Sequence, residues 1–151
     1  MWMPKSSYWT QPAGEAHITS AKGKNNIALV EIDSGPYLVI PTTDKFDNGE
    51  RPYNIHASNI LWNKNEGHQW ASSWQDKNGN VTGTLLKFVH SLNLESENSR
   101  VVVINGGIST LGQVLNPGSL ISVRQKSQLK LNCKLKDCIV YLKSNSPFKV
   151  L

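Results

Sequence analysis

The chain has 151 residues, 38% of them hydrophobic and 18% charged, and its 16 basic and 11 acidic residues give a net charge of +5. This composition is typical of a globular chain and excludes an intrinsically disordered one, and the length fits one domain with a hydrophobic core. No apolar run approaches the ~18 residues of a membrane-spanning helix, and the first residues lack a secretory signal, so we expect a cytoplasmic protein outside the membrane.

Residues 1–26 are rich in Gly, Ser, Pro, Lys and Asn, with three isolated aromatic residues. We interpret them as an extended N-terminal arm that precedes a single β domain over residues 27–151. Residues 27–41 predict two strands joined by a turn at residues 33–36. A polar loop is expected over residues 42–53.

The middle of the chain continues this pattern of short strands. Strands are expected over residues 54–62, 68–74 and 84–89, with a turn at residues 76–83. We interpret the Ser- and Asn-rich residues 91–99 as a polar loop. The whole chain is expected to hold roughly nine to eleven strands and no helix beyond a single turn.

Residues 100–143 organise the rest of the chain. Short apolar runs at residues 101–104, 114–115, 120–121 and 139–142 are separated by Gly, Asn and Pro. Leu129, Leu131, Cys133 and Leu135 alternate with Lys and Asn, which predicts a strand with one buried and one solvated face. Short strands at this spacing predict an all-β sandwich or barrel.

Cys133 and Cys138, the only cysteines, bracket four residues that could form a hairpin loop. A disulfide across this loop is geometrically possible, but closing so short a loop gains little entropy. Because a reducing cytoplasm disfavours disulfides, we expect two buried free thiols. Two cysteines alone do not make a zinc site.

Seven basic residues lie between residues 124 and 149, against Asp137 as the one acidic residue there. Lys130, Lys134 and Lys136 share the outward parity of the alternating pattern, and outward lysines keep exposed strands soluble. A nucleic-acid surface would need aromatic residues between the basic ones. We therefore favour a solvated face over nucleic-acid binding, and keep contact with acidic partners as a third alternative.

The last third of the chain resembles a cupin. The likeness rests on residues 115–119 (LNPGS), Cys133, residues 138–143 (CIVYLK) and residues 148–150 (FKV). Upstream, residues 35–39, 46–52, 62, 70–74, 83–88 and 100–106 match the same branch in order and spacing, a branch similar to the cupin domain of the anti-sigma factor ChrR. The resemblance implies a double-stranded β-helix, a small jelly-roll barrel with a central pocket.

The same resemblance implies a degenerate metal site. Most cupins hold a divalent metal on two His and one Glu from a first motif and one His from a second. Leu129 stands where the second-motif His is expected, Ser99 where the Glu is expected, and Asn93 and Glu95 near the first-motif His positions. Leucine cannot ligate a metal, so we expect no cofactor.

The four histidines do not supply a replacement set by spacing. They are His17, His56, His68 and His90, with no i, i+2 or i, i+4 pair. We interpret each as a surface or packing residue. The alternative is one divalent transition metal on His90, Glu95 and Glu97, joined by His56 or His68, in a cupin-type dioxygenase, hydrolase or isomerase.

Aromatic residues and one arginine are the remaining pocket candidates: Trp62, Trp70, Trp74, Arg100 and Tyr141. Trp70 and Trp74 lie four residues apart, so a regular strand would point both to one face. Aromatic residues inside a small barrel usually only fill it, although a ligand pocket would use the same residues. We predict a metal-free, non-enzymatic module that binds a small molecule or has a structural role. We expect a homodimer in which the N-terminal arm crosses to the partner subunit.

Overall fold

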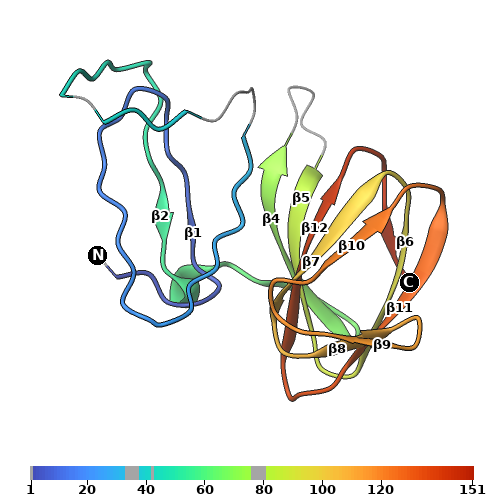
Figure 1. Cartoon of the computed structure of the whole chain (residues 1–151). Helices are drawn as coiled ribbons and strands as arrows, with labels where there is room; N and C mark the ends of the chain where they lie inside the picture. Colours follow the sequence, from blue (N-terminus) through green and yellow to red (C-terminus); the bar gives the residue numbers. More distant parts are fainter. Residues whose placement is uncertain (1, 33–37, 42, 76–80) are drawn as a thin grey trace. The chain divides into compact units, whose positions relative to one another are not determined.

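The computed structural model describes residues 2–32, 38–41, 43–75 and 81–151, with residues 72–75 and 81 described by their backbone alone (Figure 1). Contacts divide the chain into two units. The first, which we call the sandwich unit, contains Met1–Ser6 and His56–Leu151, and the second, the loop unit, contains Ser7–Ile55. The expected boundary between residues 26 and 27 stays a prediction.

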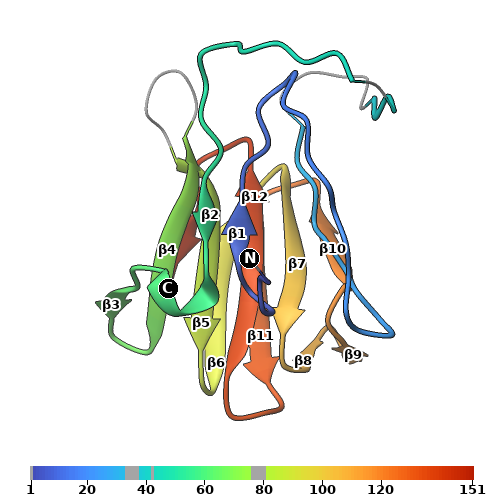
Figure 2. The same cartoon turned by 90° about the vertical axis from the view of Figure 1, so that its left-hand side faces the viewer.

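Two antiparallel sheets form the sandwich unit (Figures 1 and 2). The larger contains, in spatial order, β10 (Leu120–Val123), β7 (Ser99–Asn105), β12 (Cys138–Ser144), β5 (Val81–Phe88), β4 (His68–Gln75) and β3 (Asn63–Asn65). The smaller contains β13 (Lys149–Val150), β6 (Ser91–Ser96), β11 (Ser127–Cys133), β8 (Ile108–Thr110) and β9 (Gln113–Leu115). The described residues include no α-helix, and the predicted all-β jelly-roll class is confirmed.

The core lies between the two sheets and is aliphatic apart from one phenylalanine. Directly opposed residues of an antiparallel pair point to the same face. Val140 on β12 therefore shares its face with Leu86 and Val103, and Leu129 on β11 shares its face with Leu94 on β6. One buried cluster joins both sheets: Leu86, Phe88, Leu92, Leu94, Val101, Val103, Ile108, Val123, Leu129, Leu131, Cys138, Val140 and Leu142.

The predicted polar loop over residues 91–99 was wrong, because residues 91–96 form β6 and residues 99–105 form β7. Leu92 and Leu94 point into the core and alternate with exposed Ser91 and Asn93. At the hairpin, the inward positions are serines, and the buried Ser99 hydroxyl donates to the Ser96 hydroxyl at 2.9 Å. Residues 91–99 are polar in composition, but they alternate with a period of two. The inward serines are tolerated because their hydroxyls bond to each other.

Strands were predicted over residues 27–41. The described parts of this range, residues 27–32 and 38–41, contain none. The predicted turn at residues 33–36 lies entirely outside the described residues. A strand needs a neighbour for its backbone groups, and no described strand pairs with these residues. The expected strand over residues 54–62 shrinks to β2 (Asn54–Ile55), which pairs with β1 (Tyr8–Trp9), followed by the 3-10 helix η1 (Ala57–Asn59).

The prediction of two free thiols was also wrong, because Cys133 and Cys138 form a disulfide. Cys133 ends β11 and Cys138 begins β12, so the hairpin brings their Cα atoms to 5.7 Å, within the range that a disulfide bridges. The strand also ends earlier than the alternation suggested. Leu135 lies in the hairpin loop, 64% exposed, and is not buried.

Removing this disulfide is expected to destabilise the sandwich unit moderately. Replacing both Cys133 and Cys138 by alanine should lower the free energy of unfolding by about 2 kcal/mol, since the cross-linked loop is short. Urea denaturation of wild type and double variant measures the difference, and reductant should destabilise wild type but not the variant. Identical wild-type curves with and without reductant would contradict this expectation.

A buried hydroxyl offers a stabilising change. Thr110 is 6% exposed, and its Oγ1 has no hydrogen-bond partner among the described residues. Replacing Thr110 by valine is expected to raise the free energy of unfolding by up to about 1 kcal/mol, because the desolvation cost disappears. Thr84 is the matched control, since its hydroxyl donates to the Ala71 carbonyl at 3.1 Å. Thr84→Val should instead cost about 1 kcal/mol in the same thermal or urea unfolding measurement.

Candidate functional site

Trp70 and Tyr141, two of the predicted pocket residues, lie on different faces of the six-stranded sheet. Trp70 on β4 is opposite Leu86, so it shares the face that carries the core, where it remains 37% exposed. Tyr141 on β12 is opposite Leu85 and Val102, on the outer face. No single site within one face can use both Trp70 and Tyr141.

The two remaining tryptophans, Trp62 and Trp74, do not test the predicted pocket. Trp62 precedes β3 and is half-buried. The β4 ladder shifts register between Ser72 and Trp74, so the regular strand assumed for Trp70 and Trp74 is interrupted there. The side chain of Trp74 lies outside the described residues. A ligand role for these tryptophans stays a prediction.

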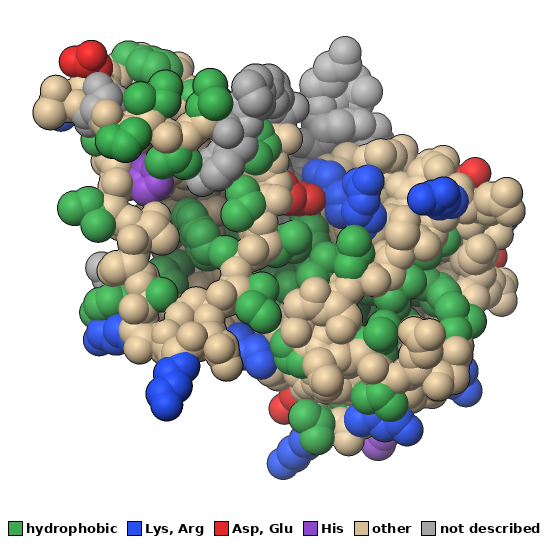
Figure 3. All heavy atoms as spheres, in the orientation of Figure 1, with side chains coloured by type: hydrophobic (Ala, Val, Ile, Leu, Met, Phe, Trp, Pro, Cys, Tyr) green, Lys and Arg blue, Asp and Glu red, His purple; other side chains and the backbone are tan. Residues whose placement is uncertain are grey.

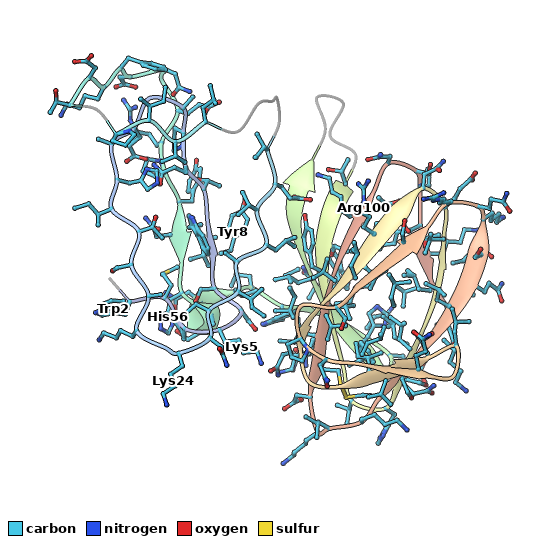
Figure 4. All side chains as sticks on the ribbon, viewed as in Figure 1. Trp2, Lys5, Tyr8, Lys24, His56 and Arg100 are labelled. Carbon is cyan, nitrogen blue, oxygen red and sulfur yellow. A yellow bond between two sulfur atoms is a disulfide. The ribbon has the colours of Figure 1, made fainter. Side chains whose placement is uncertain are left out.

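The outer face combines one buried aromatic ring with basic side chains. Lys143 is directly opposite Arg100 across the β12–β7 ladder, two residues along β12 from Tyr141. Tyr141 is 6% exposed, whereas Arg100 is exposed at the beginning of β7 (Figure 4). Directly opposed like charges are unfavourable unless an anionic group lies near them. Arg100 and Tyr141 are therefore brought to one face, and Trp70 lies on the other.

The interior offers no ligands at the positions where the resemblance expects them. Leu129 is 6% exposed and belongs to the aliphatic core. Ser99 points inward but bonds to Ser96. Asn93 and Glu95 occupy the outward positions of β6. The residues present at these positions do not fit a divalent metal, which needs three or four converging N, O or S ligands.

The alternative ligands do not converge. His90 precedes β6 and Glu97 follows it, so the chain between His90 and Glu95 spans roughly 16 Å of extended strand. His56 instead caps η1, where its Nδ1 accepts a hydrogen bond from the Ser58 backbone N–H at 3.2 Å. Across the described residues, no three His, Cys, Asp or Glu side chains are grouped so that they could hold a metal ion.

Glu95 has local partners that explain its position. Its carboxylate accepts a hydrogen bond from Gln128 Nε2 at 3.1 Å and lies 3.2 Å from Lys126 Nζ. The Gln128 hydrogen bond first, and then Lys126, hold the pKa of Glu95 below its ordinary value of 4.5. Glu95 thus connects β6 to β11 and the preceding turn on the solvated face.

The lowered pKa of Glu95 predicts a pH-dependent contribution to stability. The folded-state pKa is depressed, so the contribution is present above the ordinary pKa and disappears as the pH falls through the folded-state value. Glu95→Gln is therefore expected to be less stable than wild type at neutral pH and equally stable at pH well below 4.5. Urea denaturation across pH measures this, and added salt should shrink the neutral-pH difference. A pH-independent difference would contradict the prediction.

The described residues line at least two hollows outside the core. One, about 340 Å³, lies at the disulfide-bearing end of the sandwich unit and is lined by Lys5, Asn105, Gly106, Gly107, Val114, Asn116, Pro117, Lys134 and Leu135. The other, about 560 Å³, lies within the loop unit against residues 12–16 and residues 45–52. The sequence interpretation missed both. The paired glycines at residues 106–107 were the available signal for the first, since glycine lets a backbone approach closely.

One family model matches the whole chain, residues 1–151, and its description is "Domain of unknown function (DUF4437)". The chain belongs to this family. No curated protein matches the sequence at a significant level. Within the described residues, no helix has the length and apolar character needed to cross a bilayer.

Solved structures similar to this chain include several cupin-like domains. The Drosophila melanogaster CENP-C cupin domain is 12% identical, with 58% of this chain and 76% of that chain covered and a TM-score of 0.44. A Vibrio parahaemolyticus protein of unknown function is 14% identical, with 56% and 96% covered and a TM-score of 0.43. A Ralstonia eutropha protein of unknown function with a cupin-like fold is 16% identical, with 56% and 63% covered and a TM-score of 0.43. These likenesses concern the fold alone.

Proposed function

We propose that this DUF4437 chain is a metal-free structural or binding module, and that it makes its functional contacts on the outside of the sandwich unit. The observation that carries the proposal is the filled interior. Leu129 replaces the expected ligand and is packed against a core in which Leu94 and Leu131 are fully buried. A catalytic metal would need these aliphatic side chains replaced by polar ligands.

The filled interior also favours a structural role over small-molecule binding within the barrel. Ligand pockets combine an apolar wall with a few polar groups around open space. Here inward aliphatic side chains from both sheets form one contiguous buried cluster. A small ligand would therefore bind outside the core, and the hollow at the disulfide-bearing end is the described place for it, since Tyr141 on the outer face is already buried.

The metal content of the protein tests the proposal directly. The full chain is purified without chelator, offered excess iron, zinc, manganese and nickel in turn, desalted, and measured by inductively coupled plasma mass spectrometry. We expect far less than one metal ion per chain under every condition. One retained ion per chain would overturn the metal-free proposal, and His90→Ala and Glu95→Ala would then show whether the alternative ligand set holds it.

A further inference from the structure

The loop unit exposes two apolar segments, residues 27–32 and residues 38–40. Exposed hydrophobic side chains gather on its surface (Figure 3). The exposed fractions are 75% for Ile27, 44% for Leu29, 55% for Val30, 48% for Ile32, 68% for Leu38, 67% for Val39 and 66% for Ile40. Exposed apolar surface concentrated in this way is unusual for an isolated soluble chain and is typical of an interaction site.

The order of residues indicates strands that are apolar on both faces over residues 27–30 and 38–40. In an extended chain, Ile27 and Leu29 point to one side and Val30 and Ile32 to the other, and Glu31 ends the apolar run on the first side. A strand with one solvated face would alternate apolar with polar residues, whereas strands covered on both faces are continuously apolar. The described residues supply no ladder partner for either segment. Within the loop unit, the described residues therefore offer these segments no neighbouring strand.

The edge strand β10 has the open backbone that such a segment needs. The Val103 N–H donates to the Ser119 carbonyl at 3.0 Å, and the Gly118 N–H donates to the Val103 carbonyl at 2.8 Å. Backbone groups alternate along an antiparallel ladder, so the groups of Val101 also point to β10, where Val101 is opposite Ile121. The N–H and C=O of Leu120 and Ser122 therefore point away from β7, toward the edge.

The other edges of the two sheets fit less well. The opposite edge of the six-stranded sheet is β3, whose sequence is Asn-Lys-Asn, and polar or charged residues protect edges against pairing. The five-stranded sheet ends in β13 with two residues and in β9 with three. β10 has four residues, and Leu120 beside its open edge is 56% exposed.

We propose that the chain forms a homodimer in which residues 27–32 of each copy pair with β10 of the other copy, and residues 38–40 become buried with them. A two-fold symmetric exchange of this kind pairs both β10 edges at once. The seven exposed side chains offer roughly 700 Å² of accessible surface per copy, close to the ~800 Å² per partner of a standard interface. This inference rests on the proposed function, because it names the partner that the outside of a metal-free module contacts.

Sedimentation velocity of the full chain over a concentration series tests the proposal, with three variants. The double variant Val30→Asp/Val39→Asp places charges in both apolar segments. Ser122→Pro removes an edge N–H of β10 without removing a β7 bond. Val114→Asp is the matched control, since Val114 is 65% exposed on β9 and lies outside the proposed interface. Hydrogen exchange of wild type and variants reports on residues 27–32 and on β12.

We expect wild type at twice the 16.8 kDa chain mass. The double variant and Ser122→Pro should raise the dimer Kd about 100-fold or more, and Val114→Asp should leave it unchanged. Residues 27–32 should exchange slowly in the dimer and fast in the dissociated variants, with β12 equally protected in all, which shows that the fold is intact. A wild-type monomer overturns the proposal, whether residues 27–32 are unprotected or are protected within their own chain. So does a dimer that only Val114→Asp weakens.

The result is separate from the metal test. A monomer without metal would overturn the dimer and leave the metal-free module standing. A dimer with one metal ion per chain would do the reverse.

Discussion

Replacing Leu129 by alanine is expected to lower the free energy of unfolding by about 3 kcal/mol, measured by urea denaturation. Leu129 is 6% exposed and lies opposite Leu94 in the β11–β6 ladder, inside the cluster that joins the two sheets. Truncation removes three side-chain carbons and leaves a cavity that strands held in two ladders cannot close. Leu129→Met is the control, and it should cost less than about 1.5 kcal/mol because it nearly conserves volume.

A second substitution at Leu129 tests whether this position is part of a filled core or of a metal site that lost one ligand. Leu129→His restores the side chain that the cupin resemblance expects there. We expect it to destabilise the fold at least as much as alanine does, because an imidazole without a partner enters an apolar interior. It should retain no metal, since one histidine among leucines is not a ligand set. A Leu129→His variant as stable as wild type, or loaded with one metal ion, would contradict this account.

The short apolar runs made the sandwich unit predictable from sequence. Runs such as residues 101–104 and 139–142 contain β-branched residues and are separated by Gly, Asn and Pro. These two runs lie in β7 and β12. The strand β6 was missed because composition was given more weight than alternation, although Leu92 and Leu94 already showed the period of two. Local pattern is enough where a strand finds its neighbours in the same chain.

The errors arose where the outcome depends on a partner. Residues 27–32 and 38–41 have the local pattern of strands, but a strand forms only when another strand satisfies its backbone. The disulfide between Cys133 and Cys138 forms because the register of the hairpin brings the two side chains together. The length of the loop alone does not determine whether it forms. For the candidate site, the separation of Trp70 from Tyr141 depends on register, and no residue type encodes that separation.

Replacing Gly106 by alanine is expected to lower the free energy of unfolding by about 3 kcal/mol, combining a backbone cost with a steric one. Gly106 has a φ of +79°, in the left-handed region that favours glycine. An added Cβ would lie 2.7 Å from Cys138 Sγ and 2.9 Å from the Asp137 carbonyl oxygen. Neither neighbour can retreat easily, because Asp137 belongs to the hairpin that the disulfide closes.

Gly112→Ala separates the two costs. Gly112 has a φ of +75°, and an added Cβ there would meet nothing within 4 Å, so its substitution should cost only about 1 kcal/mol. The difference between the two variants in urea denaturation measures the contact with the hairpin. Repeating Gly106→Ala with both cysteines replaced by alanine should recover part of that difference, because the Sγ contact is gone while the Asp137 carbonyl remains. If Gly106→Ala and Gly112→Ala lower the free energy of unfolding equally, the contact of the added Cβ at residue 106 with the hairpin contributes nothing to the cost.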